Sequence, residues 1–486
     1  MLRFLASCMV LAISGTLNAQ HLRNFYNRVG GSGIDVGHNI VVLPNNDIAC
    51  AGTSSSFGSG QSDAYLVVFD SLGNEKWNKT FGGSLAEQIY DFKYNPLDSC
   101  FILVGYSSSN ANADYNAFAI RYNEKKGIQW QIQFGTSDWD MAYGLYLGQN
   151  NVLFVCGYSS NAGLGKDDAM LWKLDYNNGT LLQALKCGGS ENDYFYGITE
   201  LNSNHILLYG QTQSFGNLKG DGYIVKARIQ GDTISSRVIH ETRAADFKTS
   251  CMLANGYILL GGSIDSLNNG LCDAWFVKLD TLSLTPFYKR SHGLKACNEK
   301  CTALMPHPTF YSEAYALFNT CENDVSTTDP KLIYLTWGGD FWGGYGTGTF
   351  GFDHADDALY AMAQTPSKAL VFTGYTRGLN ASDQDLLLIR KDSASCIAES
   401  IVSLPTIELQ KKKLYYSFIY SKSKLNNTLP TLPFNQPPQA LYDISGKLFY
   451  NEQSSVFSDE ILAHAPNGFY ILKLKNGQKL KFIICD

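Results

Sequence analysis

Asp193-Tyr194-Phe195-Tyr196-Gly197-Ile198 is a stretch whose pattern recurs along the whole chain. An acidic residue is followed three positions later by Tyr, His or Thr, and then by a small and an apolar residue. Seven segments fit this pattern at separations of 52 to 58 residues. A period near fifty residues is typical of a repeat architecture. The acidic residues of the seven segments are Asp35, Glu87, Asp140, Asp193, Asp246, Glu299 and Asp357.

Each repeat contains four short segments with the composition of β-strands. In the third repeat they are Trp130–Gly135, Asp140–Leu145, Asn151–Gly157 and Asp168–Asp175, with turn residues between them. Alternating patterns and short apolar runs bounded by Gly, Asn and Asp indicate strands and not helices. Runs that are apolar on consecutive residues, such as Ala64–Phe69, predict strands covered on both faces. The sequence therefore predicts an all-β fold, with residues 20–392 forming a seven-bladed β-propeller.

The two ends of the repeat region predict how the propeller closes. Phe25–Gly31 matches Trp77–Gly83, which is the strand that precedes the second acidic segment. No matching strand follows Asp392, so the N-terminal strand is expected to complete the last blade. Closure of this kind removes exposed sheet edges. An open superhelical array of the same repeats is the alternative.

Residues 1–19 have the features of an export signal. Arg3 precedes an apolar run from Phe4 to Ile13, and Leu17-Asn18-Ala19 gives a small-residue cleavage pattern. The segment Leu5–Cys8 fits a lipoprotein signal by its letters, which is a second interpretation. No later run is long and apolar enough for a transmembrane helix, so we expect no membrane span in the mature chain.

The composition bears on partners and on redox chemistry. A net charge of −6 and the lack of a long Lys/Arg run argue against nucleic acid as a partner. Cys50, Cys100, Cys156 and Cys251 lie in apolar runs and are expected to be buried thiols. A disulfide is expected within the cluster Cys297, Cys301 and Cys321, with its pairing open. The spacing of Cys297 and Cys301 fits no standard zinc framework, so we predict no metal site there.

The C-terminal part differs in composition from the repeats. Residues 393–410 are expected to be a linker, and residues 411–486 a small β-sandwich built from short alternating strands. One hairpin turns at Ser445-Gly446, and another has Asn476-Gly477 at its tip, where positive φ angles favour such residues.

This tail resembles the C-terminal sorting domain (type A-like) of type IX secretion substrates over roughly its last 50 to 75 residues. The matching residues are Asp443, Gly446, Gly468 and Tyr470 with the strands around them. The repeats are similar to the propellers common among such exported proteins. The resemblance implies the type IX secretion machinery as a partner and a secreted or outer-surface attached protein, often with the tail removed.

The segment Asp70-Ser-Leu-Gly73-Asn-Glu-Lys-Trp77 is similar to the tryptophan-docking repeat of quinoprotein propellers. That resemblance implies that Trp77 locks neighbouring blades together. It does not by itself imply a quinone, and we predict no cofactor, apart from the cation considered below.

The seven acidic residues allow two interpretations. They could accept hydrogen bonds that join the blades, which is the interpretation we favour because every blade needs such contacts. They could instead form an axial ring that attracts a cation or a polar ligand. The residues three positions on vary between blades and are candidates for specificity: His38, Tyr90, Tyr143, Tyr196 and Tyr360, with Thr249 and Thr302 in the other two blades.

No catalytic constellation stands out. There is no nucleophile elbow, and the repeated carboxylates single out no glycosidase pair. We therefore expect a binding, adhesion or scaffold protein with an unknown surface glycan or protein ligand, and no catalytic residues. The alternative is a polysaccharide-degrading hydrolase or lyase that uses the axial mouth of the propeller.

Overall fold

The computed structural model describes residues 24–391 with short gaps, together with five strands in the tail. The gaps are 161–162, 230–232, 254–255, 267–270, 294–296, 308–311, 322–326, 337, 343–354, 379–380 and 382. The predicted signal segment 1–19 and the predicted linker 393–410 lie outside the described residues. All regular structure in the described part is β-strand, so it contains no helix that could span a membrane.

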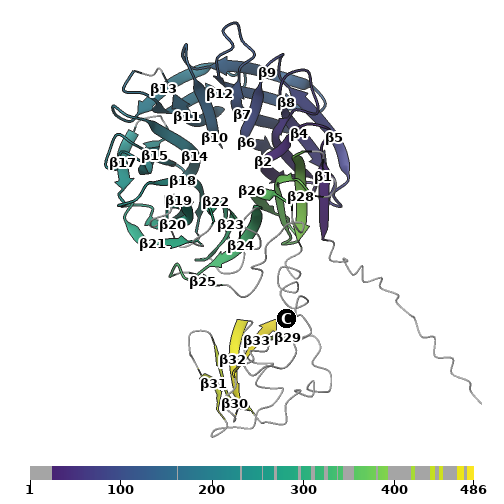
Figure 1. The fold of residues 1–486 in the computed structure, drawn as a ribbon, viewed down its shortest axis with the longest axis vertical. Helices are drawn as coiled ribbons and strands as arrows, with labels where there is room; N and C mark the ends of the chain where they lie inside the picture. The colour runs from purple at the N-terminus through teal and green to yellow at the C-terminus, as the bar shows by residue number, and fades with distance from the viewer. Residues whose placement is uncertain are drawn as a thin grey trace, which may run out of the picture. The chain divides into compact units, whose positions relative to one another are not determined.

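Seven four-stranded antiparallel sheets stand around a central axis, which confirms the predicted propeller (Figure 1). The strands of the first two blades are β2 (Asp35–Val42), β3 (Ile48–Ser54), β4 (Asp63–Phe69), β5 (Glu75–Phe81), β6 (Glu87–Asn95), β7 (Cys100–Ser107), β8 (Asn116–Asn123) and β9 (Gly127–Phe134). Those of the third and fourth are β10 (Asp140–Leu147), β11 (Val152–Ser159), β12 (Asp168–Asp175), β13 (Leu181–Cys187), β14 (Asp193–Asn202), β15 (His205–Thr212), β16 (Asp221–Arg228) and β17 (Thr233–Ile239).

The remaining blades follow the same order from the axis outward. Their strands are β18 (Ala245–Met252), β19 (Tyr257–Asp265), β20 (Cys272–Asp280), β21 (Pro286–His292), β22 (Lys300–Pro306), β23 (Ala314–Thr320), β24 (Asp329–Leu335), β25 (Phe341–Trp342), β26 (Asp357–Gln364), β27 (Leu370–Thr376) and β28 (Asp385–Lys391). The strand at the start of each repeat segment is the innermost one, so β2, β6, β10, β14, β18, β22 and β26 surround the axis (Figure 1).

The N-terminal strand closes the propeller as predicted. Strand β1 (Phe25–Val29) pairs antiparallel with β28 and forms the outermost strand of the seventh blade. The guanidinium of Arg28 lies 2.5 Å from the carboxylate of Asp385 across this pair. The backbone N–H of Asp35 in the first blade also donates to the carbonyl oxygen of Gln384 in the seventh, at 2.7 Å. These contacts rule out the open array.

The apolar core lies between blades and not within one sheet. One cluster, for example, combines Ile102 and Ala119 of the second blade with Leu153 and Trp172 of the third. Blade strands are covered on both faces for this reason, which explains their apolar runs. Burying each such side chain stabilises the fold by roughly 1.5–3 kcal/mol before entropic costs are counted.

The described residues include several buried thiols, the partly exposed Cys187 and one disulfide. Cys50, Cys100, Cys156 and Cys251 are buried and free, as predicted. The disulfide joins Cys297 to Cys321 and so selects one pairing within the predicted cluster.

The chain divides into two compact units between Ser403 and Leu404, a point inside the predicted linker. The described strands of the second unit form one sheet in the order β29-β33-β32-β30-β31. These strands are β29 (Ser417–Ser421), β30 (Pro438–Asp443), β31 (Leu448–Asn451), β32 (Gly468–Leu474) and β33 (Lys479–Cys485). A sandwich needs a second sheet, and that part of the prediction stays a prediction.

Two of the predicted sorting-motif residues are paired in this sheet. Asp443 at the end of β30 is the register partner of Tyr470 in β32. Gly468 begins β32, whereas Gly446 lies outside the described residues. The sorting role of these residues stays a prediction.

Candidate functional site

The site begins with the joint that connects each blade to the next. The first residue of each innermost segment donates its backbone N–H to a carbonyl oxygen of the preceding blade, over 2.6–3.0 Å. In six joints that carbonyl belongs to the residue just before the preceding blade's third strand, and in the joint at Glu299 it belongs to Cys272, the first residue of β20. The seven donors are Asp35, Glu87, Asp140, Asp193, Ala245, Glu299 and Asp357.

Six of the seven donors are the predicted acidic residues, and their side chains are buried. In the fourth blade the carboxyl group of Asp193 accepts hydrogen bonds from the hydroxyl of Thr212, the hydroxyl of Ser214 at 2.6 Å and the N–H of Gly189 at 2.8 Å. In the second blade Glu87 likewise accepts from Ser107. The carboxyl group therefore ties the incoming connection to the second strand of its own blade.

Three more of the acidic residues, Asp35, Asp140 and Glu299, make the same kind of contact. Asp35 accepts from Ser54 and from the N–H of Gly31, and Asp140 accepts from the N–H of Thr136 at 2.7 Å. Burial raises the pKa of Asp140, against the opposing effect of these hydrogen bonds. Thr320 donates to Glu299 at 3.2 Å.

These contacts are those of the structural interpretation, so we assign the carboxyl groups to the blade joints. The described residues contain no cluster of three or more His, Cys, Asp or Glu side chains that could hold a metal ion.

In the fifth blade the joint residue lies one position before the residue predicted from the sequence. Ala245, not Asp246, holds the joint position, and its partner across the sheet is Ile264 where other blades have Ser or Thr. Asp246 is instead partly exposed and accepts from Ser263, with Lys248 at 3.4 Å. The predicted ring of seven acids is therefore a ring of six, with a small apolar pair in the fifth blade.

Each innermost strand contains a β-bulge three residues after the joint. The bulge leaves one residue of the strand without a register partner, and a bulge re-aims that side chain. The bulged residues are His38, Tyr90, Tyr143, Tyr196, Lys248, Thr302 and Tyr360. We call these seven residues the axial ring, because they lie on the seven innermost strands.

The bulge also explains a glycine that recurs in the second strand of most blades. A Cβ atom on Gly157 would lie 1.7 Å from the carbonyl oxygen of Met141, and one on Gly105 would lie 1.7 Å from that of Gln88. Only Gly allows the backbone to approach this closely. The glycine and the bulge therefore act together to orient the side chains of Tyr143 and Tyr90.

The axial ring contains a continuous arc of aromatic side chains. The ring centroids of His38 and Tyr360 are 5.6 Å apart, those of His38 and Tyr90 5.8 Å, and those of Tyr90 and Tyr143 4.6 Å. Tyr143 and Tyr196 follow at 5.4 Å. The arc thus runs from the seventh blade through the first to the fourth, and every member is partly exposed.

The arc ends in a cation. The amino group of Lys248 lies 2.9 Å from the centroid of the Tyr196 ring, in the geometry of a cation–π contact. Thr249, the predicted residue, instead accepts a hydrogen bond from the N–H of Leu304. Thr302 completes the ring and donates to the carbonyl oxygen of Leu359 at 2.9 Å.

Burial sets the protonation states of the axial ring. It lowers the pKa of His38 to about 4, so that its imidazole is neutral at physiological pH. It raises the pKa of Tyr143 to about 12 and also raises the pKa of Tyr90. Burial lowers the pKa of Lys248, while the carboxylate of Asp246 opposes that shift. The arc from Tyr360 to Tyr196 is therefore uncharged, with Lys248 and Asp246 at one end.

A second group of aromatic residues extends from the axial ring over the second and third blades. Tyr90 contacts Tyr106, which contacts Tyr115, which in turn contacts Trp139 at a centroid distance of 5.2 Å. Trp139 is 50% exposed. These outer aromatics were not predicted as site residues. Tyr106 could have been found from the sequence, because it directly follows the recurring Gly of the second strand. No such signal marks Tyr115 or Trp139.

Comparisons with known proteins bear on the fold alone. No family model and no curated protein sequence matches the chain. PorZ, a bacterial surface component of the type IX secretion system of Porphyromonas gingivalis, is similar at 11% identity and a TM-score of 0.47, over 94% of this chain and 60% of that one.

Two other solved structures are similarly distant. The extracellular domain of BT3049 from B. thetaiotaomicron is 10% identical over 95% of this chain and 58% of that one, with a TM-score of 0.45. The polysaccharide lyase Uly1 is 8% identical over 74% of this chain and 90% of that one, with a TM-score of 0.44.

Proposed function

We propose that this protein is an exported, non-catalytic binding protein that holds a surface glycan at the axial ring. The observation that carries the proposal is the arc of five aromatic side chains, from Tyr360 to Tyr196, in mutual contact and partly exposed. Aromatic rings give large contact area at low entropic cost, and they suit the flat C–H faces of sugars.

Polar groups beside the arc supply orientation. The amide of Gln88 lies 2.9 Å from Nε2 of His38, and the hydroxyl of Tyr106 donates to the same amide at 3.4 Å. Lys248 and Asp246 stand at the far end. A few polar groups within a mostly apolar surface are the usual composition of a small-ligand site. Because the arc is uncharged, we expect a neutral sugar to be favoured over an anionic one.

The test is a glycan-binding screen with the mature full-length chain, followed by titration of the best glycan. Replacing Tyr143 with Leu should weaken binding by about two- to tenfold, since one stacking contact contributes about 0.5–1.5 kcal/mol. Tyr257→Leu is the matched control, because Tyr257 begins β19 at the end opposite to the axial ring. Equal loss in both variants, or binding only to a protein ligand, would contradict the glycan proposal.

The export route is part of the same proposal. The signal-like segment 1–19 and the sorting-like tail 411–486 support passage through the type IX machinery to the outer surface. Deleting residues 411–486 should leave the propeller folded in the periplasm and absent from the surface. Normal surface display of this deletion would contradict the sorting role.

A lyase or hydrolase at the axial mouth is the alternative function. The observation that favours it is the place of the imidazole of His38 among aromatic rings, between Tyr90 and Tyr360, at the axial ring. Incubation with uronate-containing polysaccharides separates the two functions. Release of unsaturated or reducing ends, lost in His38→Gln, would support the enzyme and contradict the binding protein.

A further inference from the structure

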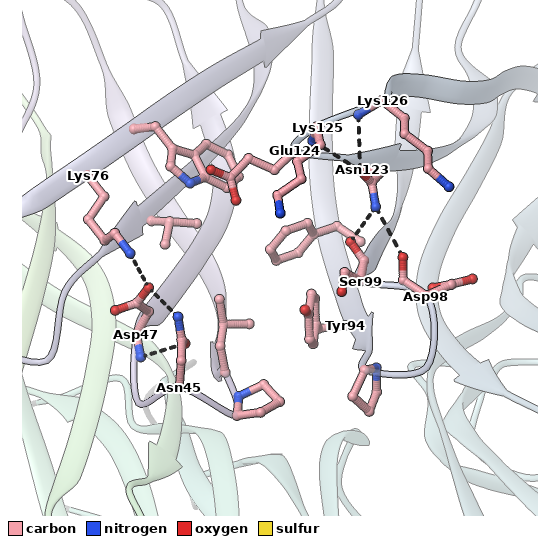
Figure 2. Close-up of a pocket in the computed structure, with 16 residues that line it drawn as sticks. Asn45, Asp47, Lys76, Tyr94, Asp98, Ser99, Asn123, Glu124, Lys125 and Lys126 are labelled. Carbon is pink, nitrogen blue, oxygen red and sulfur yellow. Dashed lines mark hydrogen bonds and ion pairs between the residues drawn. The ribbon is translucent and has the colours of Figure 1, made fainter.

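A pocket of about 580 Å³ opens between the first and second blades (Figure 2). It is lined by the turns β2–β3, β6–β7 and β8–β9 and by the start of β5. These turns lie at the ends of the strands away from the axial ring. The pocket is therefore separate from the site proposed above.

The pocket has an aromatic wall and a polar rim. Phe101 is almost fully buried, and its ring centroid lies 4.9 Å from that of Tyr94 and 5.9 Å from that of Trp77. At the rim the amino group of Lys76 lies 2.6 Å from the carboxylate of Asp47, which also accepts from the amide of Asn45 at 2.7 Å. Lys125, Lys126, Glu124 and Asp98 complete the charged lining, so acidic and basic groups balance (Figure 2).

The corresponding space between the second and third blades is filled by a tyrosine of the protein itself. The hydroxyl of Tyr176 donates to the carboxylate of Asp98 at 2.6 Å and accepts from the amide of Asn95 at 2.8 Å. The guanidinium of Arg121 lies 4.5 Å from its ring centroid, and the indole N–H of Trp130 donates to its backbone oxygen at 2.9 Å. A phenol ring thus seals that joint.

The two joints are equivalent position by position. Trp77 and Trp130 hold the same place on the outermost strands, each next to a bulge in the pairing with the third strand. The turns Asn123–Gly127 and Asp175–Gly179 have the same length and end in glycines with φ of 74° and 76°. Glu124 therefore occupies the position that Tyr176 has in the next blade.

Only the first of these two joints is open. A Cβ atom on Gly179 would lie 2.9 Å from the ring of Trp130, whereas one on Gly127 would meet nothing within 4 Å. Trp130 is buried, and Trp77 is only partly buried. Because the first joint has Glu124 where the next has Tyr176, no ring from this turn fills the pocket beside Trp77.

We propose that this pocket accepts the phenol ring of a tyrosine side chain from a partner polypeptide. The ring would contact Trp77 and Phe101, and its hydroxyl would donate to the amide oxygen of Asn45, as Tyr176 donates to Asp98. Asn45 and Asp98 hold equivalent places in their turns, since each accepts the N–H of the residue two positions later. The volume exceeds that of one phenol ring and leaves room for the flanking backbone.

The balanced charge of the lining agrees with a neutral phenol. Three basic and three acidic side chains line the pocket, so a phosphate or sulfate group gains no net attraction. A tyrosine anchor in a small aromatic pocket is also a common source of binding energy at protein interfaces.

The experiment titrates N-acetyl-L-tyrosinamide into the mature full-length chain and follows binding by NMR and calorimetry. We expect saturable binding that shifts the indole N–H signal of Trp77. N-acetyl-L-phenylalaninamide should bind roughly tenfold more weakly, because the hydroxyl partner is then left unmatched. Absence of saturable binding by the tyrosine probe would overturn the proposal.

Two variants make the test specific. Glu124→Tyr should supply the missing ring from within the chain, abolish probe binding and raise the melting temperature. Glu124→Gln removes the same charge and should bind the probe like the wild type. Retained binding by Glu124→Tyr would overturn the proposal, as would binding of methyl β-glucopyranoside at Trp77 in place of the tyrosine probe.

A converse variant provides a second test if Glu124→Tyr fails to fold. Tyr176→Glu should open the joint beside Trp130 and create a second binding event for the same probe. An unchanged stoichiometry would count against the proposal. Tyr143→Leu in the axial ring should leave probe binding unchanged, which distinguishes this site from the glycan site.

Discussion

The fourth and fifth blades form the same joint with opposite chemistry, polar in the fourth and apolar in the fifth. In the fourth, Asp193 at the joint accepts three hydrogen bonds, including one from its cross-strand partner Thr212. In the fifth, Ala245 faces Ile264, and both belong to an apolar cluster. A buried polar pair can be replaced by an apolar pair if both partners change together. The exchange at the joint agrees with a structural role for this position, because a ligand site would require the carboxyl group itself.

The same two blades also differ at the axial ring, where the stacked pair Tyr194 and Tyr196 of the fourth blade is replaced by the ion pair Asp246 and Lys248 of the fifth. Tyr196 in the fourth blade becomes Lys248 in the fifth, and the amino group stacks on the tyrosine ring. The side chain changes while the bulge that aims it is kept. Variation on a constant backbone is what a specificity position requires.

The largest effect is expected when the aspartate found at most joints is introduced at the joint of the fifth blade. Ala245→Asp would put a carboxyl group against Ile264 without a hydroxyl partner and should lower the free energy of unfolding by about 3–5 kcal/mol. Adding Ile264→Thr should restore about 1–2 kcal/mol of that loss. Chemical denaturation of the two variants checks this. A neutral effect of Ala245→Asp would contradict the assignment of Ala245 to the joint.

A smaller loss is expected from the reverse change in the fourth blade. Asp193→Ala leaves the donors on Thr212, Ser214 and Gly189 without their acceptor and should cost about 2–3 kcal/mol. The double variant with Thr212→Ile should recover about 1 kcal/mol, because it recreates the apolar pair of the fifth blade. If Asp193→Ala melts like the wild type and loses ligand binding instead, the functional interpretation of the acids is correct.

The pH dependence of one joint can be separated from the others. Because burial raises the pKa of Asp140 in the folded state, its contribution to stability is present below the unfolded pKa and is lost as the pH rises through the folded pKa. Asp140→Asn should therefore become more stable relative to the wild type as the pH increases from about 3 to 7. Thermal melts of both proteins across this range measure the difference. An opposite trend would show that hydrogen bonding outweighs burial.

The smallest effect on stability is expected at the axial ring. Lys248→Met keeps the length of the side chain but removes the charge over Tyr196, which should change the free energy of unfolding by less than about 1 kcal/mol. The same variant should alter glycan selectivity, because Lys248 is the one charged member of the axial ring. A large loss of stability would place Lys248 among the joint residues.

The sequence alone was sufficient for the architecture and for most of the joints. Seven acid-led segments at a nearly constant period, with strands that are apolar on both faces, specify seven equivalent sheets. The matching segments at Phe25 and Trp77 specify how they close. These features are readable because each blade must repeat the same local contacts, so the same residue types recur at the same spacing.

Only the tertiary structure identified the joint residue of the fifth blade correctly. Asp246 lies one residue after the joint, and sequence spacing cannot distinguish it from Ala245, because repeats tolerate a shift of one residue in loop length. The cross-strand hydrogen bonds decide it, since a one-residue change of register sends a side chain to the other face of the sheet.

The pocket beside Trp77 also depends on the third dimension. The repeat period aligns Glu124 with Tyr176, because each follows the last residue of the third strand in its blade. What the sequence does not show is that Tyr176 fills its joint whereas the joint at Glu124 contains a pocket. Local strand pattern is determined by neighbours in the sequence, whereas the filling of a joint is determined by side chains that distant segments bring together. For this protein the sequence therefore determined the number of blades and the location of the joints, and the tertiary structure decided which side chains face the axis and which joint is left open.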